Sequence, residues 1–237
     1  MSCSREDWHL PEGWRAERDG AALVLIAPDS AVLRAEFTKG AMGWRLAHAQ
    51  GREQAIARAV GMGRGRPTPR VFDATAGLGR DAAVLAALGC EVLAVERHPA
   101  VFALLEDAAA RAASDPEHRE RLGGRLRFLC GDARELLRNG AAAGCDTVLL
   151  DPMHPDRRKS ALVKQEMRLF RALVGADEDA ADLLDAALAS GVERVAVKRP
   201  AGGPPLGGRE PQGQIPGRTT RFDLYLRRME VRERDAR

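Results

Sequence analysis

The stretch VFDATAGLGRDA (71–82) contains a short apolar run, an aspartate, two glycines separated by one residue, and an Arg-Asp pair. An apolar run that ends in a glycine-rich turn predicts a strand followed by the first turn of a helix. Glycines allow a ligand to approach the backbone closely, and a helix N-terminus favours electron-rich ligand groups. The stretch therefore predicts a strand–loop–helix unit that holds a nucleotide-like cofactor.

The same alternation of strand and helix patterns continues beyond this unit. The expected strands are 71–74, 91–95, 126–130, 146–150 and 193–198. The expected helices are 80–88, 99–112, 133–139 and 160–188, the last interrupted near Gly175. This order predicts an α/β, Rossmann-like fold with a mainly parallel, doubly wound sheet. A ligand is then expected beyond the carboxyl ends of the strands.

The two ends of the chain depart from this rhythm. Residues 200–217 are rich in Pro and Gly and predict a long loop, and 221–227 alternate in polarity like a strand. Because no helix precedes it, this last strand is expected to be antiparallel. Residues 1–66 predict a small N-terminal α+β subdomain, with strands in 21–28 and 31–37 and a helix in 51–60, while 67–237 form the main domain. A flexible start before residue 20 is an open alternative.

Composition limits the class of protein. The 237 residues suffice for one domain with a small appendage, and a net charge of +3 indicates that any nucleic-acid binding depends on a local patch. The four cysteines have no histidine partners at metal-binding spacing, so no metal is expected. The N-terminus lacks a signal pattern and no apolar run is long enough to span a membrane, so we expect a cytoplasmic protein that does not bind membranes.

Acidic residues at three expected strand ends bear on the choice of cofactor. The loop has Gly77 and Gly79 but Ala82 in place of the third glycine of a dinucleotide fingerprint, a replacement that such folds tolerate. Glu96 suits the ribose of NAD and of S-adenosylmethionine equally. Asp73 and Asp132 favour S-adenosylmethionine. Its positive sulfonium and ammonium groups would lie where a dinucleotide has its pyrophosphate, and carboxylates suit these groups better than a phosphate-binding loop does. Asp132 can also accept a hydrogen bond from an adenine amino group. Any one of the acids alone can equally be a helix N-cap or a solvated turn.

The end of the fourth expected strand indicates the reaction. VLLDPMHP (148–155) has Asp151-Pro152 at this end, followed by Met153 and His154. Enzymes that methylate an exocyclic amino nitrogen of a base carry Asp/Asn-Pro-Pro-aromatic there. The carboxylate and the proline carbonyl accept the two amino hydrogens, and the aromatic residue stacks on the base. Asp151, Pro152 and His154 are therefore the candidate catalytic residues.

Taken together, these motifs resemble those of a known family, the small-subunit ribosomal RNA methyltransferase J enzymes. The matching stretches are DATAGLGRDA (73–82), ER (96–97), DPMHP (151–155), KSALVKQEMRLF (159–170), VAVKRP (195–200) and RFDLY (221–225), with GAMGWR (40–45) and GREQAIARAVG (51–61) near the N-terminus. The resemblance implies transfer of a methyl group from S-adenosylmethionine to the N2 amino group of a guanine in 16S rRNA.

The resemblance also implies a set of cofactor contacts. These fall on Arg80 and Asp81, Glu96 and Arg97, Asp132 and Ala133, and Asp151. The chain departs from the family where members often have Ser-Ser in place of Asp132-Ala133 and Phe in place of His154. Asp73, Gly77 and Gly79 complete the expected cofactor site.

A basic stretch follows the candidate catalytic loop and predicts contacts with RNA phosphates. Its cationic residues are Arg157, Arg158, Lys159, Lys164, Arg168 and Arg171. Lys198 and Arg199 are expected to leave the fifth strand on the ligand side and to extend this surface. The expected partner is 16S rRNA or the small ribosomal subunit. A solvated helix face, or a structural ion pair for Lys198 and Arg199, is the alternative.

Three other functions share part of this pattern. A methyltransferase acting on adenine N6 or on another guanine would share everything except the match to this family. An NAD(P)-dependent oxidoreductase would share the glycine loop and Glu96 but leave DPMHP unexplained. A non-catalytic RNA-binding assembly factor would have no need of Asp151. The sequence does not indicate an oligomeric state.

Overall fold

The computed structural model describes residues 8–48, 54–153, 161–175 and 179–227. A seven-stranded sheet forms the centre, in the order β6-β5-β4-β7-β8-β10-β9. Its strands are β4 (Arg70–Asp73), β5 (Glu91–Glu96), β6 (Leu126–Cys130), β7 (Thr147–Leu150), β8 (Arg194–Pro200), β9 (Gly213–Pro216) and β10 (Thr220–Leu226). Strands β4 to β8 are parallel to one another, and β10 runs antiparallel to β8 and β9. The predicted α/β class, the parallel sheet and the antiparallel last strand are confirmed.

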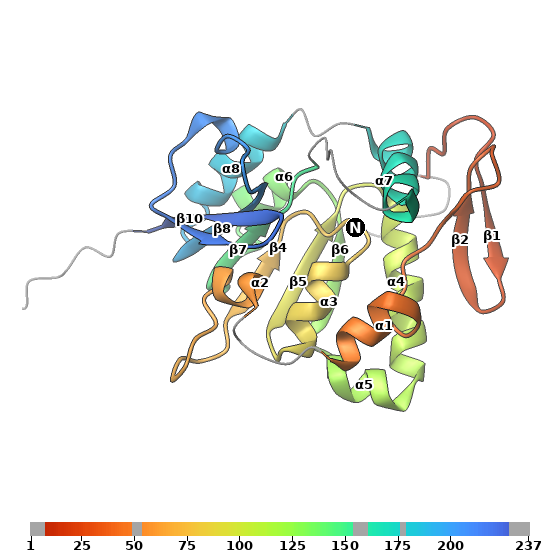
Figure 1. Cartoon of the computed structure of the whole chain (residues 1–237), viewed down its shortest axis with the longest axis horizontal. Helices are drawn as coiled ribbons and strands as arrows, with labels where there is room; N and C mark the ends of the chain where they lie inside the picture. The colour runs from red at the N-terminus through yellow and green to blue at the C-terminus, as the bar shows by residue number, and fades with distance from the viewer. Residues whose placement is uncertain (1–7, 49–53, 154–160, 176–178, 228–237) are drawn as a thin grey trace, which may run out of the picture.

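Helices cover both faces of this sheet (Figure 1). On one face lie α3 (Arg80–Ala87) and α4 (Pro99–Ser114), and on the other α6 (Ala133–Arg138) and α8 (Ala180–Ala189). Helix α7 (Ala161–Val174) follows β7 and ends at Gly175, which has φ of 83°. The interruption predicted in the helix 160–188 is therefore confirmed. Because the helices change face between β4 and β7, the ends of these two strands border a crevice.

The N-terminal segment forms a second, three-stranded antiparallel sheet of β1 (Arg15–Asp19), β2 (Ala22–Ile26) and β3 (Val32–Leu33). It continues into α1 (Gly40–Ala47) and α2 (Ala55–Ala59). Strands β2 and β3 lie within the predicted strands 21–28 and 31–37, and α2 lies within the predicted helix. Strand β1 is not among the predicted strands. Its pairing with β2 gives residues 15–19 a regular structure, although a flexible segment before residue 20 was an alternative from sequence.

The two sheets share one core. Leu25, Leu33 and Phe37 from the N-terminal segment are fully buried, and they belong to the same hydrophobic cluster as Leu104 and Leu105 of α4. The boundary proposed between residues 66 and 67 therefore does not separate two independent cores. The N-terminal segment adds a layer to the main domain.

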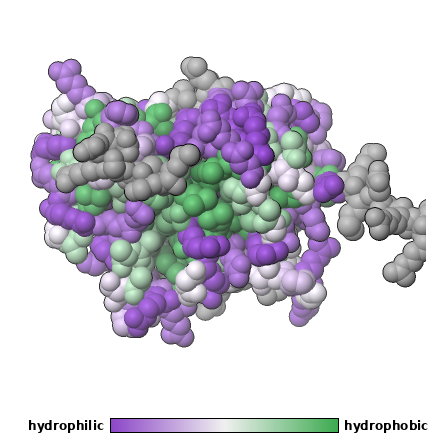
Figure 2. Space-filling view, turned by 180° about the vertical axis from the view of Figure 1, so that it is seen from behind, coloured by the Kyte–Doolittle hydropathy of each residue, from purple (hydrophilic) through white to green (hydrophobic). Residues whose placement is uncertain are grey.

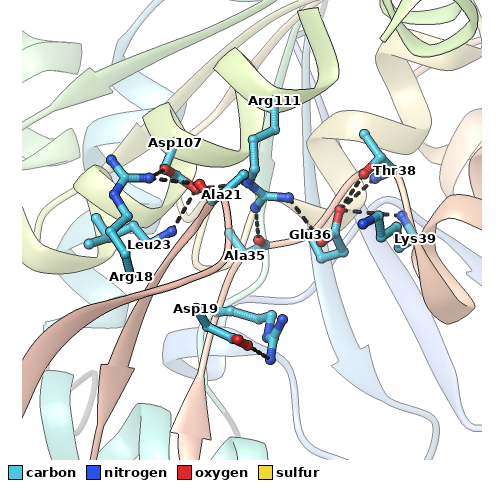
Figure 3. A network of polar contacts seen from close by, with 11 residues as sticks. Arg18, Asp19, Ala21, Leu23, Ala35, Glu36, Thr38, Lys39, Asp107 and Arg111 are labelled. Atoms are coloured by element: carbon cyan, nitrogen blue, oxygen red, sulfur yellow. Dashed lines mark hydrogen bonds and ion pairs between the residues drawn. The ribbon is translucent and has the colours of Figure 1, made fainter. Parts of the chain in front are cut away.

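A polar network fastens this layer to α4 (Figure 3). The Arg111 guanidinium donates to Glu36 Oε2 at 2.9 Å, to the Ala35 carbonyl at 2.7 Å and to Asp107 Oδ2 at 2.9 Å. Asp107 also accepts from the backbone N–H of Leu23 on β2. Arg111 thus bridges its own helix and the strand region after β3.

Three further elements differ from the sequence prediction. The expected loop 200–217 contains a single 3₁₀ turn, η2 (Leu206–Gly208), and the edge strand β9. An edge strand tolerates Pro216, because one side of it needs no hydrogen-bond partner. Helix α5 (Pro116–Leu122) was also not predicted. Asp115 is its N-cap, and the Asp115 side chain accepts a hydrogen bond from the His118 N–H.

The surface carries few large exposed hydrophobic side chains among the described residues. Trp8 and Trp14 are partly buried against the core, whereas Trp44 on α1 is 66% exposed and stacks on His48 with ring centroids 4.5 Å apart. From behind, a hydrophobic area lies in the middle of the molecule, with hydrophilic side chains around it (Figure 2). This face of the molecule thus carries both hydrophobic and hydrophilic side chains.

We predict that Arg111→Ala lowers the free energy of unfolding by about 3 kcal/mol, because it removes the cation that Glu36 and Asp107 share in a partly buried setting. Urea denaturation at neutral pH measures this change. The matched control is Arg34→Ala, which removes the exposed pair with Asp19 at 2.8 Å and should cost less than about 1 kcal/mol. Equal losses in the two variants would contradict a fastening role for Arg111.

Candidate functional site

A cavity of about 360 Å³ opens at the carboxyl ends of the parallel strands, at the crevice between β4 and β7. Its walls come from the glycine loop, the ends of β4, β5, β7 and β8, the start of α6, and α7. Eleven of the residues predicted from sequence line it: Asp73, Gly77, Arg80, Asp81, Glu96, Arg97, Asp132, Ala133, Asp151, Pro152 and Lys198. Residues far apart in the chain are thus brought together as the topology requires.

The glycine loop is fixed to the end of β5 through Glu96. The N–H of Gly77 donates to Glu96 Oε2 at 3.0 Å, and the N–H of His98 donates to Oε1 at 2.8 Å. Gly77 has φ of 53°, in the left-handed region that favours glycine. Glu96 is 5% exposed and forms part of the cavity wall. The acid predicted to hold a ribose therefore also sets the shape of the loop.

Gly79 supports the loop from behind and is not among the residues that line the cavity. It precedes α3 with φ of 73°. A Cβ at this position would lie 2.8 Å from Leu105 and 2.8 Å from Phe37. Glycine is required here so that the loop can pack on the core.

Asp73 is buried at the end of β4. Its Oδ1 accepts the N–H of Thr75 at 3.0 Å, and the Thr75 hydroxyl oxygen in turn accepts the N–H of Asp151 at 2.6 Å. Burial, together with the nearby carboxylates of Asp81 and Asp151, raises the pKa of Asp73 to about 7, although the Thr75 N–H and Lys198 oppose this. Its charge is therefore sensitive to whatever enters the cavity.

Lys198 lies between two carboxylates of the cavity. Its Nζ is 2.7 Å from Asp81 Oδ2 and 2.7 Å from Asp151 Oδ2. Burial alone would lower the pKa of Lys198, but the two carboxylates outweigh it and hold that pKa above its ordinary value. Burial likewise opposes ionisation of Asp81, yet Lys198 and Arg45 hold its pKa below the usual range. The three groups form a charged cluster.

The prediction that Lys198 and Arg199 leave β8 on the same side is wrong. The strand continues to Pro200, so these consecutive residues point to opposite faces of the sheet. Arg199 is 8% exposed and donates from Nε to the Pro204 carbonyl at 3.0 Å. Lys198 therefore matches the structural ion pair that was the alternative from sequence, and Arg199 is buried beside the loop that follows β8.

Asp132 caps α6 and anchors a network at the cavity rim. It accepts the N–H of Arg134 at 2.8 Å as well as hydrogen bonds from the Arg134 guanidinium, which lower the pKa of Asp132. Arg134 and Arg97 both pair with Asp179, each at 3.0 Å. The N-cap role considered from sequence is therefore real, and it keeps the carboxylate in the cavity wall.

Helix α7 closes one side of the cavity through Glu166, Met167 and Phe170. Glu166 accepts from Arg80 at 2.6 Å, which joins α7 to α3. Arg168 pairs with Asp29 at 2.6 Å, with both side chains largely exposed. His154, Arg157, Arg158 and Lys159, and the side chain of Lys164, lie outside the described residues.

Several cavity residues were missed from sequence. Thr75 lies within DATAGLG but was not among the predicted site residues. It joins the end of β4 to the residue after β7, because it hydrogen-bonds to both Asp73 and Asp151. Arg45 on α1 pairs with Asp81 at 3.5 Å, and Asp179 precedes α8. Arg45 ends the family-matching stretch GAMGWR (40–45), a signal that could have pointed to it, whereas no sequence signal ties Asp179 to the cavity. The position of each depends on how its element packs in the fold.

The cavity fits S-adenosylmethionine. Carboxylates surround the crevice between β4 and β7, where the positive sulfonium and ammonium groups of this cofactor would lie, and Glu96 and Asp132 line the part that would hold its nucleoside. Its volume of about 360 Å³ suits a ligand of this size. Among the described residues no group of three or more potential ligands for a metal ion is present, and no helix is long and apolar enough to cross a membrane.

Comparisons with known proteins agree with this geometry. A protein-family model described as "Putative SAM-dependent methyltransferase" matches residues 17–227. The chain is 50% identical over 209 residues to the ribosomal RNA small subunit methyltransferase J of Thioalkalivibrio sulfidiphilus, covering 87% of this chain and 81% of that protein. It is 46% identical over 231 residues to the enzyme of the same name from Chromohalobacter salexigens, covering 91% and 90%.

A solved structure gives the same answer for the fold. The SAM-dependent methyltransferase from Neisseria gonorrhoeae superposes with a TM-score of 0.68 at 35% sequence identity, covering 91% of this chain and 84% of that one. These matches favour S-adenosylmethionine as the cofactor over the nicotinamide alternative. The chain belongs to the ribosomal RNA small subunit methyltransferase J family and is an S-adenosylmethionine-dependent methyltransferase.

Proposed function

We propose that this enzyme transfers a methyl group from S-adenosylmethionine to the exocyclic N2 amino group of a guanine in 16S ribosomal RNA, in the cytoplasm. The observation that carries the proposal is the position of Asp151 and Pro152 at the end of β7, in the wall of the same cavity as the glycine loop. The names of the relatives support small-subunit rRNA as the substrate.

Asp151 and Pro152 would orient the target nitrogen. An amino group conjugated to a purine ring is a poor nucleophile, because its lone pair is delocalised into the ring. Acceptance of one amino hydrogen by the Asp151 carboxylate and of the other by the Pro152 carbonyl turns that lone pair toward the electrophile. The rate then comes mainly from positioning and from a favourable electrostatic site.

The bound cofactor supplies a methyl group activated on a positive sulfur. The methyl–sulfur bond would break as the new N–C bond forms, and the cofactor would leave as a neutral thioether. The nitrogen would then be positive and acidic, and Asp151 is placed to stabilise this charge and to accept the proton. No stronger base is needed. We assign cofactor binding to Asp73, Gly77, Glu96 and Asp132, with Arg80, Asp81, Arg97 and Ala133 in the surrounding wall.

For the RNA we propose the surface of α7. Arg168 and Arg171 lie on this helix, next in the chain to the segment that follows the catalytic loop. The Arg168–Asp29 pair is exposed, so RNA phosphate can compete with Asp29 for the guanidinium. Arg157, Arg158, Lys159 and Lys164 stay candidates on sequence grounds, and His154 stays a candidate for stacking on the base.

We predict that Asp151→Ala lowers kcat by at least about 10²-fold, because the variant lacks one acceptor for the amino group. Transfer of labelled methyl to small-subunit rRNA measures the rate. S-adenosylhomocysteine binding, measured by calorimetry, should persist and serves as the control for folding. Turnover at the wild-type rate would refute the role of Asp151.

Affinity for S-adenosylmethionine should rise with pH around neutrality. Asp73, with a pKa of about 7, is neutral at lower pH and ionised above it, and the ionised form attracts the cationic cofactor. We expect roughly tenfold weaker binding at pH 6 than at pH 8. Asp73→Asn should flatten this dependence, whereas Asp185→Asn, an exposed change on α8, should keep it. A wild-type pH profile in Asp73→Asn would contradict the assignment.

The double variant Arg168→Ala, Arg171→Ala should bind RNA more weakly and with a shallower dependence on salt, by roughly one ion for each phosphate that the protein no longer neutralises. Cofactor affinity should not change. Arg119→Ala is the control; it lies on α5, at the bottom of the view in which α7 is at the top (Figure 1). If the double variant keeps the wild-type salt dependence, α7 is a solvated face and not part of the RNA surface.

A further inference from the structure

The cluster around Lys198 is not explained by cofactor binding alone. One ammonium bridges the Oδ2 atoms of Asp81 and Asp151 at 2.7 Å each. The three side chains are 25%, 16% and 38% exposed, respectively for Lys198, Asp81 and Asp151, so water screens them only partly. The lysine thus joins the first turn of α3, beyond the glycine loop, to the loop that carries the proposed catalytic carboxylate.

We propose that Lys198 is a positioning residue for methyl transfer: its ammonium fixes the Asp151 carboxylate and keeps it ionised, so that Asp151 accepts a hydrogen bond from the target amino group. This inference rests on the function proposed above. It gives Lys198 a role inside the reaction centre, in place of the phosphate contact expected from sequence.

Ionisation of Asp151 matters because a carboxylate accepts hydrogen bonds through both oxygens and binds a donor more strongly than a neutral carboxyl does. Asp151 shares the cavity with the carboxylates of Asp73 on β4, Asp81 on α3 and Glu166 on α7. Like charges disfavour ionisation of each other. Arg80 compensates Glu166 and Arg45 lies on the far side of Asp81, whereas Lys198 contacts Asp151 directly.

Asp81 holds the lysine in place. Its Oδ2 binds Lys198, and its Oδ1 faces Arg45 at 3.5 Å. A flexible lysine held from two sides has little freedom to leave Asp151. Asp151 is held by two hydrogen bonds. Its Oδ2 accepts from the Lys198 ammonium and its N–H donates to the Thr75 hydroxyl oxygen, and together they set the direction of the carboxylate.

The test uses the full chain with Lys198→Met and Lys198→Arg. Met keeps the length of the side chain and removes the charge, whereas Arg keeps the charge. We expect Lys198→Met to lower kcat by about 10²-fold and to move the acidic limb of the kcat–pH profile up by at least about one pH unit. The KM for the cofactor should change much less than kcat. Lys198→Arg should restore the position of the acidic limb.

A lower kcat in Lys198→Met with an unmoved acidic limb would mean a structural role and would overturn the proposal. Asp81→Asn gives an independent check: the amide oxygen can still accept a hydrogen bond from Lys198 and keep it beside Asp151, while a neighbouring negative charge is removed, so the acidic limb should stay or move to lower pH. A move to higher pH would also overturn the proposal, and this variant decides the matter if Lys198→Met does not fold.

A second readout does not depend on methylation. With ¹³C-labelled aspartate carboxyls, and the Asp151 signal assigned from Asp151→Asn, NMR titration should show Asp151 titrating at higher pH in Lys198→Met than in the wild type. An unchanged titration would overturn the proposal. If the wild type methylates no rRNA, the proposed substrate fails, and the titration still judges the effect of Lys198 on Asp151.

Discussion

The contact of the Lys198 ammonium with Asp81 and Asp151 compensates the negative charge that the fold concentrates at one point. A doubly wound sheet brings the ends of β4 and β7 together, and in this chain both ends carry an aspartate. Carboxylates crowded into a partly dry crevice repel one another unless a cation lies among them. Lys198 on the adjacent strand β8 supplies this cation, because its side chain lies in the wall of the cavity.

The acids of this cavity differ in what sets their charge or their orientation. Asp73, which lies deepest and has a pKa of about 7, changes its charge with its surroundings. Asp81 and Asp151 are in direct contact with the ammonium. At the other end, Glu96 and Asp132 are held by backbone N–H groups, so their carboxylates keep a fixed orientation. Each acid is thus set by a different neighbour, although all end a strand or begin a helix.

Much of this arrangement could be predicted from the sequence. Apolar runs located the five parallel strands, and acids at their ends located the cavity, because parallel strands bring their carboxyl ends to one edge. The edge strand β9 and helix α5 were missed, since Gly and Pro in the first and the short length of the second give weak local signals. The directions of Lys198 and Arg199 depended on where β8 ends, and the contribution of Arg45 depended on the docking of α1. Long-range packing decides such features.

The bridge from Arg111 to Glu36 spans 75 positions in the chain. During synthesis the N-terminal sheet therefore leaves the ribosome well before the helix that covers it. The apolar side chains of the N-terminal segment, Leu25, Leu33 and Phe37 among them, have no complete packing surface until α4 has been made. This segment thus depends on a helix that is made later, and the nascent chain exposes these apolar side chains during that interval.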